Sequence, residues 1–302
     1  MVSRLEFVTQ KPEIFQRSDL DSLVYAQTRR NPSDGDPLSG NVGLSPMILG
    51  ETNYARTDSP LSYAAWRAQE FGKASIRLHY LKRLTGITHI ASPRLPHGTD
   101  LINLDTDFEK VSIDIPFEEQ ASADASLFTK AGIADLKATG DCAVVTGVWP
   151  GAEAIVTMHV GIRGAAKEII PHTLAQVAAK GLNPADASYY IGPHAHIFQM
   201  SHTEVDELNE IIAQGSSEVK HEYRIHTLST PQPYPALNLS SIITHQLERS
   251  RVLPGEIQIS AENTLHSPYY HSNYTTIVTG TPDGRFANLI GKLPPKSRSH
   301  RS

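Results

Sequence analysis

Short apolar runs and turn-forming segments alternate over most of the chain. Runs rich in Val, Ile and Thr that are bounded by Gly or Pro predict buried strands. They lie at 21–30, on either side of a turn at Pro96–Gly98, and at 125–129, 141–149, 153–160, 186–198, 256–265 and 275–293. So many short strands predict extensive β-sheet.

Four other segments carry a helical repeat of apolar positions. They are 59–84, 161–181, 202–216 and 238–252. In the second segment, Ile169, Leu174 and Val177 can share one face, and Pro171 can kink the helix. Asn238 is placed to cap the last helix, because its side-chain oxygen can accept from a free backbone N–H.

No internal repeat and no linker divides this pattern. We therefore expect a single catalytic domain over residues 1–293 and a basic disordered tail over 294–302. The mixture of strands and helices predicts one mixed domain of the α+β class.

Composition narrows the possible partners. The 302 residues carry a net charge of -5, with acids and bases mixed along the chain and no basic stripe of the kind that nucleic acid requires. We find no signal-peptide pattern and no apolar run of membrane-spanning length, so we expect no membrane partner. A single cysteine agrees with a cytoplasmic protein, because secreted proteins of this size more often carry paired ones. Nothing in the sequence indicates the oligomeric state.

The single cysteine, Cys142, cannot form an internal disulfide, so it is a buried apolar side chain, a nucleophile or a metal ligand. His97 lies in a tight loop, and His159 lies where a strand leads into a helix. Two imidazoles and a thiolate make a plausible zinc set with an open fourth position. The spacings of 45 and 17 residues match no compact metal motif, and the chain has 14 histidines, so the buried-cysteine alternative stays open.

Two other patterns carry candidate chemistry. His194 and His196 point to one face of a strand, but no nearby Cys, Asp or Glu completes a ligand set, so we interpret them as ordinary histidines. Arg163 lies in a Gly-rich turn before a helix start, where it and the backbone N–H groups can bind an anion. Alternatively, Arg163 is a surface charge.

Six blocks of sequence resemble, in order, those of the laccase-domain family, also called short multicopper polyphenol oxidases or laccase-domain purine nucleoside phosphorylases. They are "ASPRLPHGTDLINL", "ADASLFTKAG", "LKATGDCAVVTG", "IVTMHVGIRGAAKEII", "YYIGPHAHIF" and "GTPDGRFANLIG". The resemblance implies that His97, Cys142 and His159 bind one metal ion, usually zinc, with copper possible. It also implies a layered α/β sandwich with mixed sheets, related to the toxin deamidases.

The implied activity is zinc-dependent phosphorolysis of purine nucleosides (adenosine, guanosine, inosine or methylthioadenosine) together with deamination of adenosine. Phosphate is then the second substrate. Cys142 and Arg163 become candidate catalytic residues, with Asp141 as a proton-transfer or supporting residue. Arg163 and Arg29 are candidates for binding phosphate.

Several positions depart from the family pattern. Leu95 and Pro96 replace its Gln-Val, Gly140 replaces its Ala, and Ile162 replaces its Trp. A double Arg that the family has near its end is missing, and "SPYYHSNYTTI" stands there instead. Tyr269 and Tyr270 in this segment can stack on a base, or can be ordinary core aromatics.

Three alternatives remain from other classes. One is a copper-dependent polyphenol oxidase, although multicopper oxidases use more histidine ligands than this sequence gathers. Another is a metal-free hydrolase or deamidase in which Cys142 is the nucleophile and His159 the base. The last is a factor without enzymatic activity that keeps the metal only for structure.

Overall fold

The computed structural model describes most of the central and C-terminal chain. The described residues are 6–8, 10–16, 18–29, 87, 89–115, 119–200, 202–228, 235–270, 272 and 286–293. Three predicted segments lie wholly or partly outside the described residues. They are the helix at 59–84, the region 275–293 and the tail at 294–302. The division into a domain and a tail stays a prediction.

A six-stranded mixed sheet forms the centre of the fold. Its order is β13 (Ile257–Ile259), β9 (Ser188–Ile191), β7 (Ala143–Val148), β8 (Ile155–Val160), β5 (Ala125–Phe128) and β4 (Leu101–Asn103). The two outermost pairs are parallel and the three inner pairs antiparallel. All six strands lie in or beside segments that the apolar pattern predicts as strands.

A five-stranded sheet packs against the first. Its order is β1 (Glu6–Val8), β2 (Leu23–Arg29), β14 (Phe286–Lys292), β6 (Ile133–Thr139) and β3 (His89–Ala91). β1 and β6 were not predicted. Two short strands, β3 and β4, flank the turn at Pro96–Gly98 as predicted, and they belong to different sheets.

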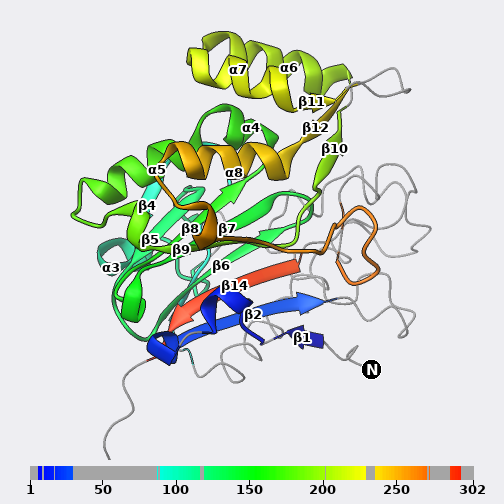
Figure 1. Cartoon of the computed structure of the whole chain (residues 1–302). Helices are drawn as coiled ribbons and strands as arrows, with labels where there is room; N and C mark the ends of the chain where they lie inside the picture. The colour runs from blue at the N-terminus through cyan, green and yellow to red at the C-terminus, as the bar shows by residue number, and fades with distance from the viewer. Residues whose placement is uncertain are drawn as a thin grey trace, which may run out of the picture.

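Helices cover the outer face of the six-stranded sheet (Figure 1). They are α4 (Ile162–Ala166), α5 (Ile169–Ala178), α6 (His202–Gln214), α7 (Ser217–His226) and α8 (Leu239–Arg249), with a short α3 (Leu104–Asp107) elsewhere. Asn238 caps α8 by accepting from Ser241 N, as predicted. α7 was not predicted. A small sheet of β10 (Ile197–Gln199), β12 (Ala236–Asn238) and β11 (Thr227–Leu228) lies beside these helices.

The predicted helix at 161–181 is two helices. The break is at Glu168, which has the left-handed φ of 59°, and not at Pro171. Pro171 lies in the first turn of α5, where its missing N–H removes no helical bond. Ile169, Leu174 and Val177 are all buried, so the predicted apolar face is confirmed.

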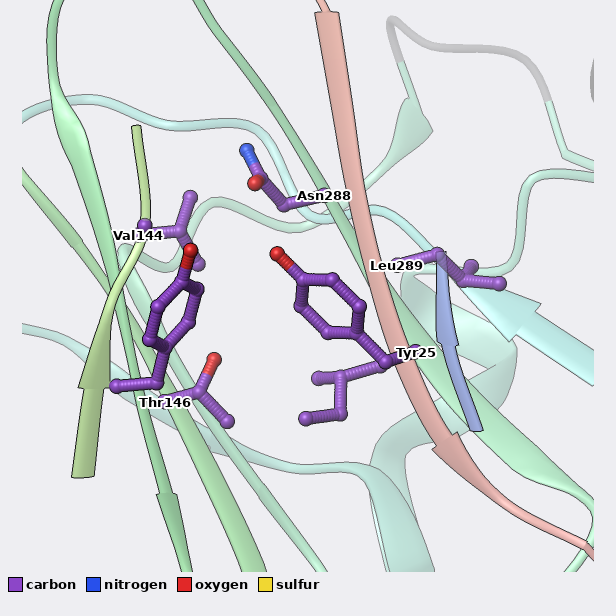
Figure 2. Close-up of a pocket in the computed structure, with 8 residues that line it drawn as sticks. Tyr25, Val144, Thr146, Asn288 and Leu289 are labelled. Carbon is purple, nitrogen blue, oxygen red and sulfur yellow. The ribbon is translucent and has the colours of Figure 1, made fainter. Parts of the chain in front are cut away.

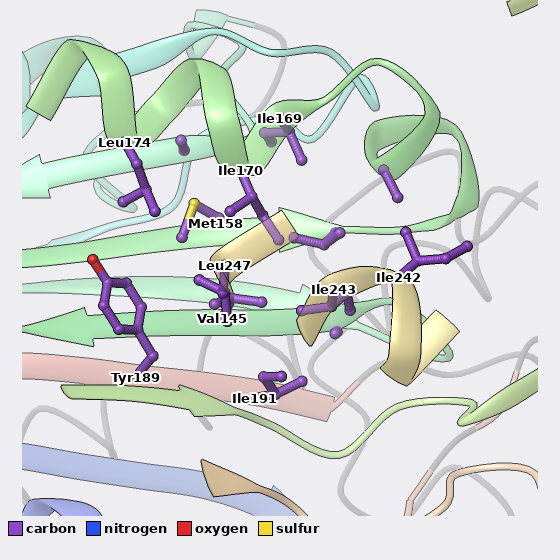
Figure 3. Packing of buried hydrophobic residues seen from close by; sticks show 14 of the residues in the cluster. Val145, Met158, Ile169, Ile170, Leu174, Tyr189, Ile191, Ile242, Ile243 and Leu247 are labelled. Atoms are coloured by element: carbon purple, nitrogen blue, oxygen red, sulfur yellow. The ribbon is translucent and has the colours of Figure 1, made fainter. Parts of the chain in front are cut away.

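The main apolar core lies between the six-stranded sheet and the helices. Figure 3 shows Val145, Met158 and Ile191 of the sheet facing Ile170 of α5 and Leu247 of α8. A second cluster, with Phe128, Ile155 and Tyr190 among its members, lies between the two sheets. The molecule therefore has three layers, which are the helices, the six-stranded mixed sheet and the five-stranded mixed sheet. The predicted layered α/β sandwich is confirmed.

The space between the sheets also contains polar groups. Tyr25 of β2 and Val144 and Thr146 of β7 face a cavity of about 10 Å³, which is about the room that one water needs (Figure 2).

No helix in the described part of the chain is both long and apolar enough to cross a bilayer.

Candidate metal centre

Cys142 and His159 come together because of the register of two antiparallel strands. Val144 of β7 pairs with His159 of β8. Cys142 lies two residues before Val144, in the short link between β6 and β7, so its side chain falls on the same face as His159 and diagonal to it. This face is turned toward the second sheet.

His97 reaches the same place from the loop between β3 and β4. Its Nε2 lies 3.8 Å from Cys142 Sγ, and its ring centroid lies 5.0 Å from that of His159. One ligand atom from each of the three residues lies within 4.8 Å of the other two. The structure thus brings together the three side chains that the sequence nominates as ligands.

The backbone of His97 is held in an unusual conformation. Its φ of 58° is left-handed, which costs about 1–3 kcal/mol for a residue other than glycine. Three hydrogen bonds, made by two residues, restrain the loop at this point. Asp124 accepts from His97 N at 3.2 Å and from Gly98 N at 2.6 Å, and Lys167 Nζ donates to His97 O at 2.9 Å.

Asp124 also orients the second histidine, and sequence reasoning missed it. Its Oδ1 lies 2.9 Å from His159 Nδ1, so Nδ1 donates to the carboxylate and Nε2 is left for a ligand. Both side chains are buried. A carboxylate, a histidine and a metal in this arrangement are common in metal sites. The signal in the sequence that could have pointed to Asp124 is its place in the family block "ADASLFTKAG".

The charges of the three groups are strongly coupled. Burial of the Cys142 thiol works to raise its pKa, but the neighbouring imidazoles of His159 and His97 outweigh burial and lower it to about 6. Burial works to lower the pKa of His159, but Cys142 and Asp124 raise it to about 9. Burial also opposes ionisation of Asp124, yet its bond to His159 and its other contacts lower its pKa. Cys142 is therefore a thiolate at neutral pH.

Gly161 leaves room for the sulfur. A Cβ atom at this position would lie 2.6 Å from Cys142 Sγ and 3.3 Å from His97 Cδ2. Any side chain here would displace two of the three ligands. This contact gives a physical reason for the glycine that follows the His159 strand.

Arg163 has an acidic partner. Its guanidinium donates from two nitrogens to one carboxylate oxygen of Glu207 on α6, and both side chains are partly exposed. Arg163 lies inside α4, whose N-cap is Gly161, and not in a turn before the helix as predicted. An anion would have to compete with Glu207 for Arg163, so the anion role stays a prediction.

Asp141 points to a different neighbour from Cys142. Its Oδ1 accepts from Thr264 Oγ1 at 2.8 Å, and its backbone carbonyl accepts from Ala195 N. Its carboxylate is not one of the three clustered ligand groups. These contacts favour the supporting role over proton transfer.

The remaining predicted substrate residues are Tyr269, Tyr270 and Arg29. Tyr270 is buried, donates to Gln27 Oε1 at 3.1 Å and packs on Phe286, as a core aromatic does. Tyr269 is 39% exposed. Arg29 ends β2, and its side chain lies outside the described part of the molecule. The substrate roles of these three residues stay predictions.

The rings of His194 and His196 lie close together, with centroids 4.7 Å apart, but both residues lie in the link between β9 and β10 and not on a strand as predicted. His194 is fully buried and uses both nitrogens, on Gly192 O and Ser240 Oγ, each at 2.8 Å. Burial lowers its pKa to about 4, so it is neutral. These bonds account for it as an ordinary core histidine.

The donor set of the centre suits a transition metal. A thiolate and two imidazoles, one of them oriented by a carboxylate, fit zinc with an open position for a water or substrate atom. Two histidines and one cysteine also fit copper. The cluster could therefore hold a metal ion, and its ligand chemistry is compatible with either metal.

A known protein family matches most of the chain. The family model of the multi-copper polyphenol oxidoreductase laccases matches residues 76–292. No curated protein matches the chain.

Solved structures with the same fold include the hypothetical protein YfiH of Bacillus licheniformis, at 16% identity and a TM-score of 0.67, covering 90% of this chain and 93% of that one. YlmD of Geobacillus stearothermophilus has 19% identity and a TM-score of 0.68 over 94% and 100% of the two chains. A Neisseria meningitidis protein has 18% identity and a TM-score of 0.63 over 95% and 99%.

Proposed function

Because the chain belongs to the multi-copper polyphenol oxidoreductase laccase family, we propose that it is a zinc-dependent purine nucleoside phosphorylase with adenosine deaminase activity. The match covers more than two thirds of the chain, and the resemblance read from the sequence blocks is thereby confirmed. The substrates proposed are adenosine, inosine, guanosine and methylthioadenosine, with phosphate.

The observation that carries the proposal is the convergence of His97, Cys142 and His159 from three separate segments. Structural sites usually close all four positions of zinc with protein ligands, whereas catalytic sites leave one open. Among the described residues the cluster supplies three ligands and no fourth. This favours a catalytic role over a purely structural one.

The protein's own groups have distinct tasks in this proposal. Asp124 keeps the proton of His159 on Nδ1, so that Nε2 binds the metal. Cys142 offers a thiolate without a further proton loss at neutral pH. Lys167 and Asp124 hold the His97 loop from its two sides. When bound, zinc supplies a Lewis acid that activates a water or a phosphate oxygen.

Copper chemistry is less well supported. Two histidines and a cysteine suit a single electron-transfer copper, but multicopper oxidation needs further copper ions with ligands of their own. Within the described ranges, His97, Cys142 and His159 form the one cluster of three or more candidate ligands that lies close enough to bind an ion.

A metal-free Cys–His enzyme is the second candidate, and one observation favours it. Cys142, His159 and Asp124 lie in the order of a nucleophile, a base and an orienting carboxylate, and the thiol pKa is about 6. This candidate gives His97 no role. A chelator would leave such an enzyme active, whereas alkylation of Cys142 would inactivate it.

The proposal is tested on the purified full chain. Bound metals are measured by elemental analysis, and the four nucleosides are followed by chromatography with and without phosphate. We expect zinc, phosphate-dependent release of free base, and loss of both metal and turnover in His97→Ala. His172→Ala, at an exposed position on α5, is the matched control and should change neither.

Undiminished zinc in His97→Ala would rule out the proposed ligand set. Bound zinc without turnover of any nucleoside would rule out the proposed substrates. Oxidation of a phenol by a copper-loaded protein would support the oxidase instead.

A further inference from the structure

A second group of histidines lies at the contact between α7 and α8, away from the Cys142 centre in the sequence. His226 is the last residue of α7, and His245 lies in the second turn of α8. Their ring centroids are 6.0 Å apart. Neither residue has a role in the proposed enzyme chemistry.

A buried carboxylate orients one of these histidines. Glu222 is fully buried, and its Oε1 lies 2.8 Å from His245 Nδ1, while its Oε2 accepts from Gln246 Nε2 at 2.7 Å. The bond fixes the His245 ring and leaves Nε2 free to act as a ligand. Asp124 holds His159 in the same way in the first centre.

The other histidine has a nitrogen without a hydrogen-bond partner. His226 Nε2 is enclosed and has no partner among the described residues. Burial lowers the pKa of His226, and the nearby His245 and His221 lower it further, against the opposing effect of Glu222.

Both residues are among those that line one surface cavity of about 310 Å³. Glu248, one turn after His245 on α8, lines the same cavity together with the hydroxyls of Ser240, Ser241 and Thr244. No Lys or Arg is among the described residues that line it. Because the buried carboxylate of Glu222 and the lining carboxylate of Glu248 are nearby, the cavity favours a cation over an anion.

The ring separation is compatible with a shared ion. A metal–nitrogen bond of about 2.1 Å puts each ring centroid roughly 3.2 Å from the ion, so two imidazoles at about the tetrahedral angle of zinc have centroids roughly 5.2 Å apart. His97 and His159 are already at 5.0 Å, and His226 and His245, at 6.0 Å, reach this separation when their side chains move about 1 Å closer.

We propose that His226 and His245 form a second site, for a transition-metal cation such as zinc, with Glu222 as the orienting residue of His245. Water completes the coordination, because the site offers two protein nitrogens. This site is independent of the proposed catalytic function and of Cys142.

The test measures zinc bound by the full-length protein after equilibrium dialysis. Cys142→Ala removes a ligand of the first centre, so that the remaining zinc reports the second. We expect Cys142→Ala to keep about one zinc per chain, and to lose it when His226→Gln or His245→Ala is added. His172→Ala, added in the same background, is the control and should keep the zinc.

His226→Gln is the decisive variant, because it leaves the buried Glu222–His245 pair intact and the fold undisturbed. Far-UV circular dichroism checks the fold of each variant. If Cys142→Ala binds no zinc, or if its zinc survives His226→Gln, the second site does not exist. If the wild type and Cys142→Ala bind the same amount of zinc, the first site is missing. If that zinc is then lost in the His226 variant, only the proposed function is overturned.

Discussion

Asp124 joins the two histidines of the centre through a single carboxylate. It accepts from the His97 and Gly98 backbone and from the His159 ring. The residue therefore fixes both the strained loop and the tautomer of His159. Its position before β5 brings it there, because β5 pairs with β8, the strand that carries His159.

We predict that Asp124→Asn weakens zinc binding by roughly 10- to 100-fold, because such orienting carboxylates contribute that much to metal affinity. The affinity is measured by competition with a chromophoric chelator. Asp186→Asn, at an exposed position, should bind zinc like the wild type. Equal affinities for the two variants would contradict the role given to Asp124.

Gly161→Ala should disrupt the centre sterically, since the new methyl would lie 2.6 Å from Cys142 Sγ. We expect zinc affinity to fall by roughly tenfold or more, as when ligand orientation is disturbed. Gly255→Ala is the matched control, because a Cβ there meets nothing within 4 Å. An unchanged affinity in Gly161→Ala would show that the sulfur does not occupy this position in the metal-bound protein.

Ligand chemistry could nominate His97, Cys142 and His159 from the sequence, because few residue types bind transition metals. Asp124 and Lys167 could not be nominated in this way. Their contacts depend on the pairing of β5 with β8 and on the path of the His97 loop, neither of which leaves a trace in local spacing.

Strand β6 carries a buried ion pair between the two sheets. Lys137 Nζ lies 3.1 Å from Asp135 Oδ2 and 2.9 Å from Ser126 Oγ, and both charged side chains are fully buried. Thr157 of β8 donates to the same carboxylate. The alternation of a strand puts Asp135 and Lys137 on one face, so the pair is a property of the element.

We predict that Lys137→Met lowers the free energy of unfolding by about 3–5 kcal/mol, because it leaves the Asp135 charge buried without a cation. Urea denaturation measures the change. Lys180→Met, at an exposed position after α5, should have little effect.

Adding Asp135→Leu to Lys137→Met should recover much of the loss, since an apolar pair of similar volume replaces the ions. A single Lys137→Met variant as stable as the wild type would show that the ion pair is not closed in solution.

The same charges explain why β6 was not predicted. An inward face with an aspartate and a lysine breaks the apolar pattern by which buried strands are recognised. α7 was missed for a similar reason, because few of its residues are apolar and its buried face includes Glu222. The break between α4 and α5 at Glu168 was invisible because glutamate rarely adopts a left-handed conformation.

At the scale of the whole molecule, the apolar pattern was sufficient to predict a mixture of strands and helices, and the family resemblance supplied the layered sandwich. It could not predict that the chain crosses between two sheets after β3, or that strands distant in sequence become neighbours. The centre exists only because these long-range pairings bring three distant segments to one place. Local pattern carries little information about such pairings.

The affinity of the full-length protein for zinc should increase as the pH rises. Zinc needs a neutral His159 and a Cys142 thiolate, and their pKa values are about 9 and about 6. Between about pH 6 and pH 9, each zinc ion that binds displaces one proton, which comes from His159. The affinity for zinc should therefore rise about tenfold per pH unit. Below pH 6 a second proton must leave Cys142, and the dependence should become steeper.

Chelator competition from pH 5.5 to 8.5, at about constant ionic strength, measures this slope. An affinity that does not change with pH would show that the Cys142 and His159 protons are not displaced by the metal.

Metal reconstitution tests the central claim most directly. Zinc is removed from the full-length protein with a chelator, and phosphate-dependent release of base from inosine is followed as zinc is returned in steps. The account predicts no activity without metal and a rise in step with filling of the Cys142 centre, absent in Cys142→Ala. Full turnover by the metal-free protein, or none by the zinc-loaded protein, would contradict it.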